Sequence, residues 1–141
     1  MASKKVFIDS SVLYAFVDRA NPDHVQSVKI LEQLSLQGSQ LYTSIQSVID
    51  ANNAVNNQLG ATLSLDFLQA ISESSMEILY PQKADFVASY RLLRLNRYKQ
   101  LSLKEAINSV LMQKKGISQI LTFAYWQNLL GSQSYLASSR F

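Results

Sequence analysis

The chain has 141 residues, 48% hydrophobic and 16% charged, which is the composition of one ordinary globular domain; no repeat or low-complexity linker divides residues 1–141. No apolar run approaches the roughly 20 residues of a membrane span, and the run at 6–8 stops at Asp9, so we expect no membrane segment and no export. Cysteine is absent, which excludes disulfides, thiolate nucleophiles and sulfur-based metal sites and fits a cytoplasmic protein. The formal charge of +3 permits a nucleic-acid partner without establishing one.

Short strands and amphipathic helices alternate in the first half of the chain. Residues 5–8 predict a buried strand, because Val-Phe-Ile is β-branched and aromatic, and a helix begins at Ser10. The segment 21–23, Asn-Pro-Asp, predicts the start of a second helix, which Gly38 ends. A strand at 41–43 then precedes a third helix. The apolar stripe expected on the second helix is Val25, Val28, Leu31 and Leu34, and that on the third is Ile45, Val48, Ile49, Val55 and Leu59.

The same alternation continues in the second half. Residues 62–72 and 83–98 predict helices. The segment Ser102-Leu103-Lys104-Glu105 has the form of a capping box, which predicts the start of another helix, and Gly116 ends it. The strands expected here are 76–80, 117–122 and, weakly at an edge, 134–137.

Strands that are short, apolar throughout and separated by helices favour a parallel sheet covered on both faces, an α/β fold. In such folds ligands bind outside the carboxyl ends of the strands. Asp9 and Thr122, both at predicted strand ends, are therefore the first places to look for chemistry.

Three acids lie at or near these turns: Asp9 after the first strand, Asp50 on the helix after the second, and Glu105 before the fourth. Carboxylates brought together repel one another, so a protein that assembles them generally binds a divalent cation there. Mg²⁺ or Mn²⁺ would suit, because both prefer oxygen ligands.

These segments resemble the PIN domain family, and especially the VapC-type toxins of toxin-antitoxin pairs. The stretch 6–13, Val-Phe-Ile-Asp-Ser-Ser-Val-Leu, is similar to the opening strand of that family with its Asp followed by Ser or Thr. The segments 42–50, 101–106 and 116–123 resemble the three later motifs. The resemblance spans nearly the whole chain and implies a three-layer α/β/α domain with a short central parallel sheet.

The resemblance also implies an activity and a site. Asp9, Asp50 and Glu105 would hold Mg²⁺ or Mn²⁺, which lowers the pKa of a bound water so that hydroxide attacks an RNA phosphodiester. The chain departs from the family pattern in three places: Asp50 stands for Glu, Glu105 for Asp, and Ala124 for a fourth acid. Asn108, one helical turn beyond Glu105, could supply a replacement oxygen.

Each of these residues also has a simpler structural interpretation. Asp9 could cap the helix that follows it, and Asp50 could be a solvated boundary residue. Glu105 could reach back to the backbone of Ser102 as part of the capping box. His24, in the first turn of its helix, is most simply a surface residue.

Basic residues recur on the predicted helix 83–98 and just beyond it. They form a stripe with Tyr90 and Tyr98 close by, which could grip phosphates and stack on bases, or could simply be a solvated helix face. Tyr125 and Trp126, beside the lost acid, could be core, a lid or a dimer contact. The basic residues are Arg91, Arg94, Arg97 and Lys99.

Two functions from different classes follow. The first is a magnesium-dependent endoribonuclease similar to VapC toxins, weakened by Ala124. The second is a catalytically inactive PIN-fold module that binds RNA or protein. The resemblance implies RNA, an antitoxin protein and a second copy of the chain as partners.

Overall fold

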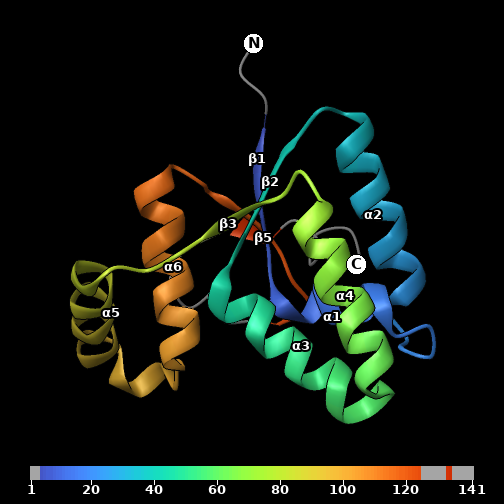
Figure 1. Cartoon of the computed structure of the whole chain (residues 1–141). Helices are drawn as coiled ribbons and strands as arrows, with labels where there is room; N and C mark the ends of the chain where they lie inside the picture. Colours follow the sequence, from blue (N-terminus) through green and yellow to red (C-terminus); the bar gives the residue numbers. More distant parts are fainter. Residues whose placement is uncertain (1–3, 125–132, 135–141) are drawn as a thin grey trace.

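The computed structural model describes residues 4–124 and 133–134 (Figure 1). Helices and strands alternate as the sequence predicts, with most boundaries within two residues of the predicted ones. The strands are β1 Lys5–Ile8, β2 Gln40–Ser44, β3 Glu77–Leu79, β4 Gln119–Leu121 and β5 Gln133–Ser134. The helices are α1 Ser10–Val17, α2 His24–Leu36, α3 Ile45–Leu59, α4 Ala61–Glu73, α5 Lys83–Leu95 and α6 Leu103–Lys115, with a 3-10 turn at Arg97–Lys99.

The strands form one sheet in the order β3-β2-β1-β4-β5, and every pairing is parallel. The first strand in sequence is therefore the central one, with Phe7 in register with Tyr42 of β2 and Ile120 of β4. Of the predicted edge strand 134–137, residue 134 lies in β5, and 135–137 fall outside the described residues.

Side chains of β1 alternate between two cores, which gives the three-layer α/β/α fold. Val6 and Ile8 pack on one face with residues of α1, α2, α3 and α4, whereas Phe7 packs on the other with Met112 of α6. Figure 1 shows α5 and α6 together on one side of the sheet and the other helices on the opposite side. The predicted parallel sheet covered on both faces is confirmed.

Two helix details differ from the prediction. The helix predicted over 83–98 ends at Leu95, where the side chain of Asn96 donates to the Leu92 carbonyl oxygen at 2.9 Å. Val25 was expected on the buried stripe of α2, but it is 63% exposed, because α2 buries the face that carries Ser27, Ile30 and Leu34. Ile49 on α3 is likewise 53% exposed.

Both ends of α6 confirm the predicted signals. Ser102 and Glu105 form the complete capping box, and Gly116 ends the helix at φ +73°, a left-handed conformation that favours glycine. In residues 4–124 and 133–134, none of the helices has the length and apolar character needed to cross a bilayer.

Candidate functional site

Asp9 follows the central strand and lies at the N-cap position of α1, but its side chain makes no capping hydrogen bond. Its Oδ2 atom instead accepts hydrogen bonds from Thr122 Oγ1 at 2.7 Å and from Ser11 Oγ at 3.1 Å. The residue is only 2% exposed. The simple interpretation of Asp9 as a helix cap is therefore wrong, and its carboxylate is available for another role.

The other oxygen of Asp9, Oδ1, is buried and has no hydrogen-bond partner among residues 4–124 and 133–134. Gln46 Oε1 and Gln119 Oε1 are the other buried side-chain oxygens without a partner in the described part of the chain, and both belong to neutral amides. Leaving a buried carboxylate oxygen without a hydrogen-bond donor or a cation costs more free energy than leaving a buried amide oxygen without a partner. Asp9 Oδ1 is therefore the oxygen of this site that is best suited to accept a cation or a hydrogen-bond donor.

The turn after β4 fixes the direction of the Asp9 carboxylate. Thr122 Oγ1 accepts the backbone N–H of Ala124 at 3.0 Å while donating to Asp9, and Ser11 Oγ accepts the backbone N–H of Phe123 at 3.0 Å. Two hydroxyls that are themselves held by backbone groups leave Asp9 little rotational freedom. Ser11 and Thr122 therefore orient the Asp9 carboxylate.

Asp50, on α3, is paired with a residue that sequence reasoning did not single out. Lys104 Nζ on α6 lies 3.0 Å from Asp50 Oδ2 and donates to Ser10 Oγ at 2.8 Å. Desolvation by itself would raise the pKa of the Asp50 carboxyl; hydrogen bonds from Lys104 and Ser10, together with the Lys104 charge, outweigh it and hold that pKa below its usual 3.8. Asp50 is therefore ionised at neutral pH.

Glu105 has the structural role that its capping-box motif suggested. Its Oε1 accepts the backbone N–H of Ser102 at 2.9 Å, and Ser102 Oγ accepts the backbone N–H of Glu105 at 3.1 Å. The box leaves Oε2 as the remaining oxygen. A role for Glu105 beyond capping rests on that second oxygen.

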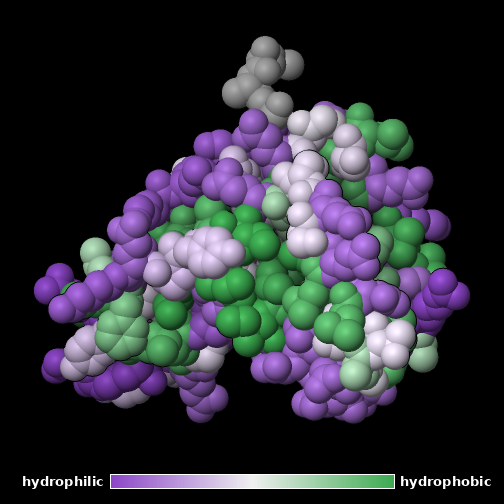
Figure 2. Space-filling model, in the orientation of Figure 1, coloured by the Kyte–Doolittle hydropathy of each residue, from purple (hydrophilic) through white to green (hydrophobic). Residues whose placement is uncertain are grey.

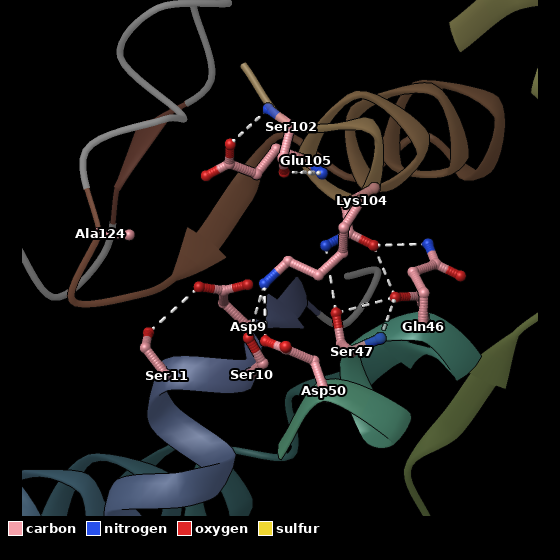
Figure 3. A network of polar contacts seen from close by, with 12 residues as sticks. Asp9, Ser10, Ser11, Gln46, Ser47, Asp50, Ser102, Lys104, Glu105 and Ala124 are labelled. Atoms are coloured by element: carbon pink, nitrogen blue, oxygen red, sulfur yellow. Dashed lines mark hydrogen bonds and ion pairs between the residues drawn. The ribbon is translucent and has the colours of Figure 1, made fainter. Parts of the chain in front are cut away.

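The three predicted acids line one open pocket of about 300 Å³. Figure 3 shows how they lie: Asp9 and Asp50 flank the Lys104 ammonium, and Glu105 projects from the start of α6. Ala124 also lines the pocket and offers only a methyl group. The full lining is Asp9, Ser10, Ser11, Tyr14, Asp50, Ala51, Ala54, Lys104, Glu105 and Ala124.

The carboxylate oxygens in this pocket are of the type that a single hard cation prefers, but they do not form a site in which protein side chains supply most of the ligands. Within the described residues, no three His, Cys, Asp or Glu side chains are grouped so that they could hold a metal ion. Mg²⁺, however, commonly uses only one or two carboxylates and keeps several waters. The partnerless Asp9 Oδ1 and the Asp50 carboxylate match that requirement.

Asn108, predicted as a spare ligand, is used elsewhere. It is fully buried, and its Oδ1 accepts hydrogen bonds from Ser44 Oγ at 2.5 Å and Gln46 Nε2 at 2.7 Å, while its Nδ2 donates to Ser47 Oγ at 3.1 Å. It does not line the acidic pocket. Both lone pairs of its oxygen are occupied, so Asn108 joins α6 to the start of α3 and has no oxygen left for a cation.

Tyr14, also in the lining, donates to Asp18 Oδ2 at 2.7 Å. Burial, the hydrogen bond to Asp18 and the Asp18 charge raise the pKa of the Tyr14 phenol to about 12, so the ring is neutral at physiological pH. His24 lies away from the pocket, with Nδ1 placed 2.8 Å from the Ala15 carbonyl oxygen. It links α2 to α1.

The basic stripe is exposed and lies on α5 and the turn after it. Arg94 donates to Tyr90 Oη at 3.2 Å, and the Arg97 guanidinium lies 4.7 Å from the centre of the Tyr98 ring. Arg91 and Lys99 are also exposed. None of the four lines the acidic pocket, and Tyr125 and Trp126 lie outside the described residues.

A second, larger cavity is apolar. It has a volume of about 480 Å³ and lies between α1, α2 and α4, lined by side chains such as Phe16, Leu31 and Phe67, with Asp66 as its one acidic residue. Its lining has no hydroxyl or carboxylate arrangement comparable to that around Asp9. Among the described residues, the side chains suited to binding a metal therefore line the smaller pocket and not this cavity.

Lys104 was missed because its partner is distant in sequence. One signal was nevertheless available: a lysine in the first turn of a helix opposes the positive end of the helix dipole and so favours an acidic partner nearby. Only the fold identifies that partner as Asp50, on a different helix.

The fold has close counterparts among solved structures. VapC20 of Mycobacterium tuberculosis, described as a sarcin-ricin loop cleaving toxin, matches with a TM-score of 0.83 at 15% identity, over 90% of this chain and 95% of that one. FitAcB from Neisseria gonorrhoeae matches with a TM-score of 0.69 at 13% identity, over 92% of this chain and 96% of that one.

VapBC2 from Rickettsia felis, solved bound to a DNA fragment from its promoter, matches with a TM-score of 0.65 at 9% identity, over 92% of this chain and 96% of that one. No protein-family model matches the chain, and no curated protein is similar to it in sequence. Agreement over nearly the full length of all three structures, at such low identity, establishes the architecture: the chain has a PIN-domain fold of the VapC type.

Proposed function

We propose that this chain is a VapC-like, metal-dependent endoribonuclease whose activity is weakened by the altered acidic set. The observation that carries the proposal is the buried, partnerless Oδ1 of Asp9 beside Asp50, at the carboxyl end of the central parallel strand. Ligands bind at this edge of parallel α/β sheets. A charged oxygen left without a donor at that place is what a cation site requires.

Asp9 and Asp50 would hold one Mg²⁺ or Mn²⁺ ion, and Glu105 could add its second oxygen. When bound, the ion would supply an activated water for phosphodiester hydrolysis. The protein contributes a carboxylate fixed in direction by Ser11 and Thr122. Ala124 supplies no ligand, and the capping box holds one Glu105 oxygen, which is why weak activity is expected.

RNA is the substrate class that the comparisons favour, since VapC20 is described as a toxin that cleaves the sarcin-ricin loop. The exposed residues Arg91, Arg94, Arg97 and Lys99 provide positive charge for phosphates, and Tyr90 and Tyr98 provide aromatic rings for stacking.

The second candidate is a PIN-fold module that binds RNA or protein without cleaving. Two observations favour it: Lys104 already neutralises Asp50, and a methyl group stands at Ala124. Both candidates are compatible with RNA binding. Only the first predicts metal-dependent cleavage that needs Asp9.

The deciding experiment compares wild type with Asp9→Asn in cleavage of a fluorogenic RNA, in Mn²⁺, in Mg²⁺ and in EDTA. We expect wild-type cleavage to stop in EDTA and Asp9→Asn to lose at least about 100-fold in rate, since it removes a charged ligand. Asp66→Asn on α4 is the matched control, because it makes the same change at an exposed residue away from the acidic pocket and should cleave like wild type. Cleavage that survives Asp9→Asn, or no cleavage by wild type, rejects the nuclease in favour of the binding module.

We also propose a cytoplasmic location, a homodimer and an antitoxin partner, as in toxin-antitoxin pairs. Exposed Leu65 and Leu68 on α4 support a protein partner, and Figure 2 shows hydrophobic residues gathered across the middle of the viewed face. Light scattering after size exclusion distinguishes a dimer from a monomer.

A further inference from the structure

The acidic pocket contains a cation supplied by the protein itself. Figure 3 shows the Lys104 ammonium directed into the space flanked by Asp9, Ser10 and Asp50. It lies 3.0 Å from Asp50 Oδ2 and 2.8 Å from Ser10 Oγ, and the Lys104 side chain is only 27% exposed. The group therefore occupies the part of the pocket where the two proposed metal ligands face each other.

An ammonium group and a divalent cation need the same oxygens. If Asp50 held Lys104 at hydrogen-bond distance and a metal at ligand distance at once, the two positive groups would lie close together and repel each other, which weakens binding of the metal. Lys104 satisfies Asp50 but leaves Asp9 Oδ1 without a partner, so the ammonium fills the pocket only in part.

An ordinary surface ion pair does not account for this arrangement. Lys115, also on α6, pairs with Glu77 of β3 at 3.1 Å, and these two side chains are 42% and 51% exposed. Lys104 is 27% exposed, although its partner Asp50 is 56% exposed. Lys104 also bonds the buried hydroxyl of Ser10, and it lines the same pocket as Asp9, whose buried Oδ1 has no partner among the described residues. Its position in the first turn of α6 is unfavourable for the helix dipole, so the acidic pocket is what holds it there.

We propose that Lys104 is the resident cation of the acidic pocket, and that a divalent metal binds at Asp9 and Asp50 only when the Lys104 ammonium withdraws from Asp50. This inference rests on the proposed function in placing the metal at this pocket. Lys104 would then lower the affinity of the pocket for the metal, because its ammonium group competes with the metal for Asp50.

The test is direct Mn²⁺ binding to the full chain, followed through the electron paramagnetic resonance signal of free Mn²⁺, with no RNA present. Lys104→Met removes the charge and keeps the apolar stem, and should bind Mn²⁺ about 10-fold more tightly, equivalent to about 1.4 kcal/mol. Lys104→Arg keeps the charge and should bind like wild type. Lys115→Met changes the net charge equally at an exposed pair outside the pocket, and should also bind like wild type.

Adding Asp9→Asn to Lys104→Met should abolish the gain, which places the tighter site in this pocket. Lys104→Gln replaces Lys104→Met if urea unfolding shows that the methionine variant does not fold. Affinity of Lys104→Met within about twofold of wild type overturns the inference, and so does an equal gain in Lys115→Met, which would mean a general charge effect.

The two proposals fail separately. Tight Mn²⁺ binding by Lys104→Met without RNA cleavage by any variant supports the competition and rejects the nuclease. Metal-dependent cleavage by wild type without tighter binding in Lys104→Met supports the nuclease and rejects the competition.

Discussion

Helix α6 contributes to two polar clusters that differ in how their hydrogen bonds are satisfied. Around Asn108, the amide joins Ser44, Gln46 and Ser47 with both ends in use, and the one atom left without a partner, Gln46 Oε1, belongs to a neutral amide. Around Asp9, one carboxylate oxygen is doubly hydrogen-bonded and the other is buried with no partner among the described residues. Buried polar groups that are satisfied hold a fold together, whereas a charged group left unsatisfied calls for a ligand. We therefore assign the first cluster to stability and the second to function.

Replacing Asn108 should give the largest effect on stability. Asn108→Ala leaves the buried Ser44 hydroxyl and the Gln46 amide without their shared acceptor and opens a small cavity, so we expect a loss of about 3 kcal/mol in the free energy of unfolding. Urea denaturation followed by circular dichroism measures it.

Asn56→Ala is the matched control, because Asn56 is exposed on α3 and alanine favours a helix. Its free energy of unfolding should equal or slightly exceed that of wild type. If Asn108→Ala cost no more than the control, the Asn108 cluster would lose its assignment to stability.

Ala124→Asp tests the acidic cluster with a smaller expected effect. Ala124 already lines the pocket, so a carboxylate there adds a ligand oxygen and a negative charge near Asp9. We expect Mn²⁺ affinity to rise about 10-fold, or about 1.4 kcal/mol. Isothermal titration calorimetry measures the affinity directly.

Ala124→Asn adds a side chain of the same size without the charge, and should gain less than about threefold. Equal binding by Ala124→Asp and wild type would mean that the backbone at this turn cannot present a ligand to the cation, and that lack of the fourth acid is not what limits the site.

Local sequence signals predicted those features that depend on neighbours in the chain. The apolar run before Asp9 placed the acid at the end of the first strand, and the Ser102–Glu105 spacing predicted a capping box that is present in full. Capping and strand formation are decided within a few residues, so the sequence contains enough information to infer them.

Features that depend on how two helices meet could not be inferred in the same way. Spacing placed Asn108 one turn beyond Glu105, but packing against the start of α3 turned its amide to Ser44 and Ser47 instead of the pocket. The Lys104–Asp50 pair likewise joins α6 to α3. Such pairs depend on the rotation of one helix against another, which helical periodicity alone does not determine.

The basic stripe supports a last prediction, with the smallest expected effect, which separates RNA binding from the pocket. Arg94 and Arg97 are exposed and held near tyrosine rings, so their charges are available to phosphates. Arg94→Gln should weaken RNA binding about threefold near 0.1 M salt and reduce the slope of log affinity against log salt by roughly 0.7, the value for one phosphate contact on a single strand. Fluorescence anisotropy with a labelled RNA measures both the affinity and the slope.

Lys29→Gln is the matched control, because it makes an equal charge change at an exposed position on α2, and it should leave the slope unchanged. If both variants lowered the slope equally, the protein would attract RNA through its net charge alone, and the stripe would be an ordinary solvated helix face.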